Sequence, residues 1–223
     1  MNSSPSPRVL LCNTILNPAI AMPDIASALD AADRGLDASL ERLYAFLRIP
    51  SISTDPAYAG ECRRAAEWAA ASLREIGFDA AARETLGLPL VVGHRRCGRP
   101  GAPRVLFYGH YDVQPPDPLE LWDSPPFEPQ RVAGPHGEMI IARGASDDKG
   151  QVMTFFEACR ALMATVGELP VDVTILVEGE EESVGVGLIP FLKANKEEVA
   201  SDFAQREEEG SAEHRVTVYR NFS

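Results

Sequence analysis

The sequence predicts an α/β fold in which a mostly parallel sheet is flanked by helices. Residues 105–108 and 171–177 are short apolar runs, as expected for strands that are buried on both faces. Between them, residues 151–166 carry a broad apolar face at helical spacing. Strand, helix and strand in this order favour parallel pairing through a right-handed crossover.

The other elements are predicted from apolar spacing and from Gly and Pro. Leucine and isoleucine recur at spacings of three, four and seven over residues 25–47, which predicts one helix that Pro50 ends. A second amphipathic helix is predicted over 61–76, with Gly77 as its C-terminal stop. Two short segments complete the prediction, a strand at 90–92 and a helix at 189–196.

Composition divides the chain into three parts. Residues 1–22 are expected to be an unstructured or weakly signal-like extension, because polar residues interrupt their apolar stretch. Residues 23–200 form the predicted folded part. Residues 201–223 are a divergent charged tail, in which only 216–219 resemble a strand. The tail is expected to add no further layer of sheet, so the fold is expected to be cut short.

Charge and cysteine content limit the classes of function. The formal net charge of -12 argues against nucleic acid as a partner, since phosphate binding needs a basic face. No apolar run approaches the roughly 20 residues that span a bilayer, so no membrane partner is expected. The cysteines show neither zinc-ribbon nor disulfide spacing, which favours a cytoplasmic, reducing location. They are Cys12, Cys62, Cys97 and Cys159.

The first candidate motif follows the predicted strand 105–108. His110 offers an imidazole for a metal ion, and Asp112 is placed to hold the other ring nitrogen. Taken alone, a His and an Asp at a strand exit also fit a hydrogen-bonded turn. Both interpretations remain open on these residues.

The second motif, Asp147 and Asp148, precedes the predicted helix 151–166. These carboxylates could cap the helix and favour its positive end. Alternatively, Asp147 could bridge two cations through its two oxygens, as two-metal hydrolases require.

The third motif is the acidic run at 178–183, after the strand 171–177. A solvated loop is the usual explanation of such a run. Ligands of α/β sheets, however, gather outside the carboxyl ends of strands, where His110 also lies if the two strands are parallel neighbours. Two consecutive carboxylates, Glu181 and Glu182, could then serve as a base and a metal ligand.

The three motifs in this order, YGHYDVQP at 108–115, GASDDKG at 144–150 and EGEEES at 178–183, resemble one family. It is the zinc-dependent metallopeptidase family of carnosinase, glutamate carboxypeptidase, aminoacylase, acetylornithine deacetylase and succinyl-diaminopimelate desuccinylase. The spelling of the first and third motifs is most similar to the bacterial dipeptidase branch. The resemblance implies an incomplete zinc-peptidase catalytic domain, truncated at its C-terminus and without the lid domain through which the family dimerises.

The resemblance also implies a role for each matched residue. His110 would bind one metal, with Asp112 orienting its ring. Asp147 would bridge the two divalent ions, and Glu182 would bind the second. Glu181 would be the general base that takes a proton from the attacking water. Zinc is the expected metal, with manganese and cobalt as alternatives.

The sequence departs from the family pattern after the third motif. Val184 stands where a small residue is expected, and neither a further carboxylate ligand nor a downstream His is evident. Residues 207–209 lie at a plausible distance but lack a preceding apolar strand, and His214 lies in a region unlike the family's. A cis peptide bond between Asp147 and Asp148 is a further feature that the resemblance implies.

Three functions follow from these observations. The first is a truncated dipeptidase-like hydrolase whose own activity is in doubt, because each metal keeps two protein ligands where catalytic zinc usually has three. The second is a non-catalytic remnant that binds metal or a protein partner. The third is an N-acyl amino acid deacylase that recruits ligands from the tail. The expected substrate is a dipeptide or an N-acyl amino acid.

Overall fold

The computed structural model describes residues 25–135, 137–207 and 216–220. Its central sheet has the strand order β1-β2-β6-β3-β7-β8. These strands are β1 Asp79–Arg83, β2 Leu90–Arg95, β3 Arg104–His110, β6 Asp172–Glu178, β7 Phe203–Glu207 and β8 Val216–Arg220. Strand β3 pairs in parallel with β6 and β7, whereas β1 with β2, β2 with β6, and β7 with β8 pair antiparallel. Strands β1, β6, β3 and β7 therefore point the same way, which confirms the predicted α/β fold with a mostly parallel sheet.

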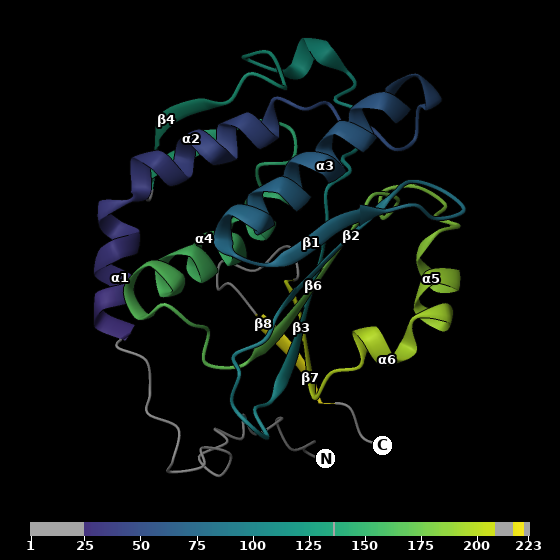
Figure 1. Cartoon of the computed structure of the whole chain (residues 1–223). Helices are drawn as coiled ribbons and strands as arrows, with labels where there is room; N and C mark the ends of the chain where they lie inside the picture. The colour runs from purple at the N-terminus through teal and green to yellow at the C-terminus, as the bar shows by residue number, and fades with distance from the viewer. Residues whose placement is uncertain (1–24, 136, 208–215, 221–223) are drawn as a thin grey trace, which may run out of the picture.

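Helices cover both faces of the sheet (Figure 1). Helices α3 and α4 pack on one face, α1 and α2 lie against α4, and α5 packs on the opposite face. The helices are α1 Ile25–Arg34, α2 Leu36–Leu47, α3 Ala59–Ile76, α4 Lys149–Val166, α5 Leu188–Ala194 and α6 Lys196–Val199. Two 3-10 turns, Pro56–Tyr58 and Leu119–Leu121, and a hairpin of β4 Gln130–Gly134 with β5 Gly137–Ile141 complete the described elements. None of the helices in the described ranges is long and apolar enough to cross a membrane.

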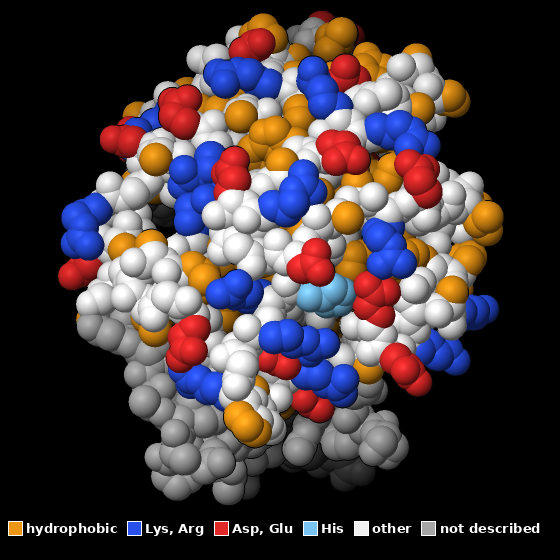
Figure 2. Space-filling model, viewed as in Figure 1, with side chains coloured by type: hydrophobic (Ala, Val, Ile, Leu, Met, Phe, Trp, Pro, Cys, Tyr) orange, Lys and Arg blue, Asp and Glu red, His pale blue; other side chains and the backbone are white. Residues whose placement is uncertain are grey.

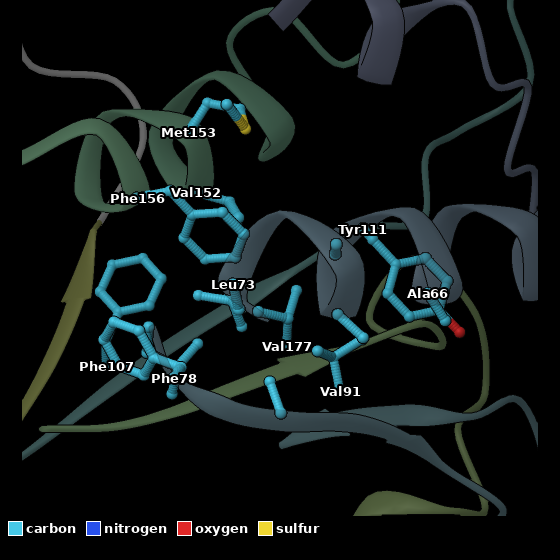
Figure 3. Packing of buried hydrophobic residues seen from close by; sticks show 14 of the residues in the cluster. Ala66, Leu73, Phe78, Val91, Phe107, Tyr111, Val152, Met153, Phe156 and Val177 are labelled. Carbon is cyan, nitrogen blue, oxygen red and sulfur yellow. The ribbon is translucent and has the colours of Figure 1, made fainter. Parts of the chain in front are cut away.

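The main core lies between the sheet and helices α3 and α4 (Figure 3). Phe107 of β3 stacks on Phe155 of α4 with ring centroids 4.1 Å apart, and Phe156 is fully buried beside them. Helix α3 buries a series of alanines, whose small side chains let the helix lie close to the sheet. The smaller core under α5 consists of Leu90, Val92, Leu176 and Phe191.

The prediction of one helix over residues 25–47 is wrong. The structure has two helices, α1 and α2, that are separated at Gly35. Gly35 has φ -89° and ψ 0°, outside the helical region. Because glycine has a low helix propensity, interrupting the helix at this residue costs little free energy. The apolar spacing did not reveal the break because it continues across Gly35.

The prediction that the tail adds nothing to the sheet is also wrong. Strand β7 pairs in parallel with β3, from Val105 beside Phe203 to Tyr108 beside Arg206. Asp202 fixes the start of this pairing, since its carboxylate accepts from the Arg104 amide at 2.8 Å and its own amide donates to the Arg104 carbonyl at 2.9 Å. The strand-like run at 216–219 is confirmed as β8, which pairs with β7.

A charged cluster joins α2 to α4. Arg42 donates two hydrogen bonds to Glu157, at 2.7 and 2.5 Å, and Ser39 donates a third at 2.8 Å. Burial alone raises the pKa of Glu157, but the hydrogen bonds from Arg42 and Ser39 outweigh it and hold that pKa below its usual value. The cluster therefore stabilises the ionised form of Glu157.

We expect Glu157→Gln to lower the free energy of unfolding at neutral pH by about 1.5 to 3 kcal/mol, as for hydrogen bonds to a charged group. A lowered folded-state pKa contributes stability above the unfolded pKa of about 4.3, and that stability is lost as the pH falls. The deficit of the variant should therefore shrink below about pH 4. Urea unfolding from pH 3 to 7 measures it. Glu84→Gln, which breaks an exposed ion pair with Arg63, is the control and should show no comparable deficit. An equal loss at both sites would contradict the prediction.

Candidate active site

The three predicted motifs meet at the carboxyl edge of the sheet. Strands β3 and β6 are parallel neighbours, and His110 lies directly beside Glu178 in their register. Glu181 and Glu182 follow in the turn after β6, while Asp147 lies just before α4. The expectation that the first and third motifs share one strand edge is thus confirmed.

His110 lies between two carboxylates. Its Nε2 is 2.9 Å from Asp147 Oδ1, and its Nδ1 is 3.3 Å from Asp112 Oδ1 and 3.1 Å from the Asp112 carbonyl. Burial lowers the pKa of His110, but the hydrogen bonds to Asp112 and Asp147, together with the charge of Asp148, raise it to about 11. The position therefore stabilises a positive charge.

The carboxylates of Asp147 and Glu182 lie close together, and Asp147 contacts the imidazole of His110. The hydrogen bond from His110 is the largest cause that lowers the pKa of Asp147, and Glu182 also hydrogen-bonds to that carboxylate. Burial and the neighbouring charge of Asp147 raise the pKa of Glu182, although Gln114 Nε2 donates to its Oε2 at 2.7 Å. Two carboxylates that repel each other around one imidazole form a site that favours a cation.

The structure does not support the alternative that the Asp148 side chain caps α4. It occupies the N-cap position, but its side chain makes no capping hydrogen bond. Its Oδ2 instead accepts from the backbone amide of His110 at 2.9 Å. A Cβ atom at Gly109 would lie 2.7 Å from that oxygen, so glycine is needed for this approach. The peptide bond between Asp147 and Asp148 is cis, as the resemblance implies.

Two buried residues of the quoted motifs, Glu178 and Lys149, support the site, although no sequence pattern assigned them a role. Glu178 accepts a hydrogen bond from Tyr108, and burial raises the pKa of Glu178. The fully buried Lys149 donates to the carbonyls of Ile49 at 2.6 Å and Phe46 at 3.2 Å, which ties the start of α4 to the end of α2. Burial lowers the pKa of Lys149 to about 7. The only sequence signal for Lys149 was its place beside the paired aspartates.

The tail candidates are only partly described. Because Arg206 pairs with Tyr108, the backbone of Glu207 reaches the level of Gly109, at the same edge as His110. A strand thus leads up to this glutamate, although its sequence, FAQRE, is not the apolar run that was expected before a ligand. Residues 208 and 209 and His214 lie outside the described residues.

The side chains of His110, Asp147 and Glu182 are of the types that bind a divalent metal ion, although here they contact one another. In the described ranges, no three His, Cys, Asp or Glu side chains are arranged to hold a metal ion. The carboxylate of Asp147 instead contacts both the imidazole of His110 and the carboxylate of Glu182. Imidazole nitrogen and carboxylate oxygen are ligands that zinc and manganese accept. The carboxylates of Asp112, Asp147 and Asp148, which raise the pKa of His110, would also attract a cation, so these residues fit such an ion.

Comparisons with known proteins agree with the motifs. Residues 106–219, just over half of the chain, match the family model described as peptidase family M20/M25/M40. The chain is 32% identical over 161 residues to Cys-Gly metallodipeptidase DUG1 of Candida albicans, covering 67% of this chain and 33% of that protein. It is 33% identical over 114 residues to the human Beta-Ala-His dipeptidase, covering 51% of this chain and 22% of the relative.

Solved structures show the same fold. Human carnosine dipeptidase 1 aligns with a TM-score of 0.74 at 27% identity, over 82% of this chain and 41% of that one. The dipeptidase Dug1p of Saccharomyces cerevisiae aligns with a TM-score of 0.68 at 27% identity, over 77% and 38%. The chain thus spans about a third or less of the length of the curated relatives that it matches.

Proposed function

The chain belongs to peptidase family M20/M25/M40, and on that premise we propose that it supplies the metal-binding edge of a two-metal dipeptidase that hydrolyses peptide bonds. The observation that carries this proposal is the meeting of His110, Asp147 and Glu182 at one strand edge, with Glu181 in the adjoining turn. Residues 23–200 would then be the N-terminal part of the catalytic domain.

In this proposal, His110 and Asp147 would hold one divalent ion, and Asp147 and Glu182 would hold the other. Bound metal would polarise the scissile carbonyl and lower the pKa of a water molecule. Zinc is the proposed ion. Each ion would then have two protein ligands among the described residues, whereas catalytic zinc usually has three. A further donor is needed, and Glu207 is a candidate because β7 brings its backbone to the same edge.

Glu181 is the proposed general base. Its side chain is exposed, and its backbone amide donates to Asp112 Oδ1 at 3.3 Å, which fixes the turn that carries it. An exposed carboxylate beside the metal ligands can take a proton from the attacking water and return it to the leaving amine. The names of the relatives support a dipeptide as substrate, with Cys-Gly and β-Ala-His as the compounds to test first.

Metal removal tests the proposed function. We expect the purified chain to bind two divalent ions and to hydrolyse Cys-Gly or β-Ala-His, to lose this activity on chelation, and to regain it with zinc. Mass spectrometry measures the number of metal ions bound per chain, and release of the free amine measures the rate of dipeptide hydrolysis.

Each other outcome selects a different function. Metal binding without hydrolysis of any amide would overturn the proposal in favour of a non-catalytic metal-binding remnant. Hydrolysis of N-acyl amino acids but not of dipeptides would make the protein a deacylase. If the chain neither binds metal nor hydrolyses any of these substrates, it does not act alone.

A further inference from the structure

One buried carboxylate, that of Asp112, connects both sides of the site. Asp112 is fully buried. Its Oδ1 lies 3.3 Å from His110 Nδ1 and accepts from the Glu181 amide at 3.3 Å. Its Oδ2 accepts from the Glu182 amide at 3.0 Å. The orientation of this carboxylate therefore sets the ring of His110 and the position of the Glu181–Glu182 turn together.

A serine distant in sequence donates to the same carboxylate. Ser53 Oγ donates to Asp112 Oδ2 at 2.6 Å, the shortest of the contacts that Asp112 makes. Apart from His110, no cationic side chain in the described part of the chain forms an ion pair with Asp112. The Ser53 hydroxyl is thus a side-chain donor to the same oxygen of Asp112 that accepts from the Glu182 amide.

The segment that carries Ser53 is itself fixed to the site. Ser51 Oγ donates to the Tyr111 carbonyl at 2.6 Å, and the Val113 amide donates to the Ser51 carbonyl at 3.0 Å. Ile52 forms a parallel bridge with Val113. The backbone on either side of Asp112 is therefore tied to residues 51 and 52, which places the backbone of Ser53 beside the Asp112 carboxylate.

We propose that Ser53 is a positioning residue of the active site, whose hydroxyl fixes the Asp112 carboxylate and through it both His110 and the Glu181–Glu182 turn. The inference rests on the proposed function for its consequence on metal binding. Its consequence for the turn is independent of metal. Without the hydroxyl, the Asp112 carboxylate can rotate, and its three other contacts weaken together.

Two measurements on the full chain test this role, with Ser53→Ala, Ser53→Thr and Ser39→Ala as variants. Ser39 also donates a hydrogen bond to a carboxylate, that of Glu157, but far from the site, so Ser39→Ala controls for loss of stability. We expect Ser53→Ala to weaken zinc binding about tenfold, as for the loss of a group that orients a ligand. Ser53→Thr keeps the hydroxyl and should restore the affinity.

The second measurement is hydrogen exchange in the metal-free protein. The amides of Glu181 and Glu182 should exchange faster in Ser53→Ala than in the wild type. In Ser39→Ala they should exchange at the wild-type rate. Wild-type exchange at both amides in Ser53→Ala would overturn the inference, as would an equal loss of zinc affinity in Ser39→Ala. A wild-type chain that binds no zinc would count against the proposed function, while the exchange rates would still decide the role of Ser53.

Discussion

Glu181→Gln is expected to lower the rate of dipeptide hydrolysis about 100-fold to 10,000-fold, the range usual for loss of a general base. Glutamine has nearly the same shape but cannot accept the proton of the attacking water. Its backbone amide still donates to Asp112, so the turn and the adjacent ligand Glu182 should keep their places. Bound metal per chain should therefore stay at the wild-type value, measured in the same samples as the hydrolysis rate.

The neighbouring glutamate provides the matched control for Glu181. Glu180 Oε2 accepts from the Gly187 amide at 2.9 Å, a contact that the amide oxygen of glutamine can keep. Glu180→Gln should therefore hydrolyse dipeptides at close to the wild-type rate. If the two variants lose activity equally, or if Glu181→Gln loses metal together with activity, Glu181 is not the base and the assignment must be changed.

The helices and strands that were predicted correctly from the sequence are those that bury an apolar face. Helices α3 and α4 and strands β3 and β6 bury one or both faces, so their apolar residues recur at the period of the element. Since β3 and β6 flank one helix, the crossover rule placed them side by side and parallel, and their carboxyl ends defined the candidate site.

The errors occurred where backbone contacts decide the structure. Strand β7 is recruited by backbone pairing with β3 and by the hydrogen bonds of Asp202, although its sequence is polar and charged. Apolar spacing carries no information about such pairing. Likewise, the break at Gly35 depends on the conformation of one residue, because the apolar stripe continues through it.

The supporting residues of the site were invisible to the sequence for a different reason. Lys149 reaches Ile49, 100 residues away in sequence, and Ser53 reaches Asp112, 59 residues away. A buried lysine and a loop serine look like ordinary polar residues until the chain is folded. The ligand candidates were found because they cluster at strand ends, whereas the groups that orient them come from another segment.

Gly150 couples the stability of the fold to the geometry of the site. It is the second residue of α4 and follows the Asp147–Asp148 pair closely. A Cβ atom at this position would lie 2.0 Å from the carbonyl oxygen of Ala145 and 3.1 Å from its carbonyl carbon. Both atoms belong to the backbone, so no side-chain rotation can relieve the contact. The turn that carries Asp147 would have to move.

Gly150→Ala is therefore expected to lower the free energy of unfolding by about 3 kcal/mol, at the upper end of the usual cost of overpacking. Zinc affinity should fall as well, because Asp147 is displaced with its turn. Gly60→Ala is the matched control, since nothing lies within 4 Å of a Cβ atom at this position near the start of α3. There alanine should raise the free energy of unfolding by about 0.5 to 1 kcal/mol through its better helix propensity. Urea unfolding of both variants measures the difference, and a Gly150→Ala protein as stable as the wild type would show that the turn can relax without cost.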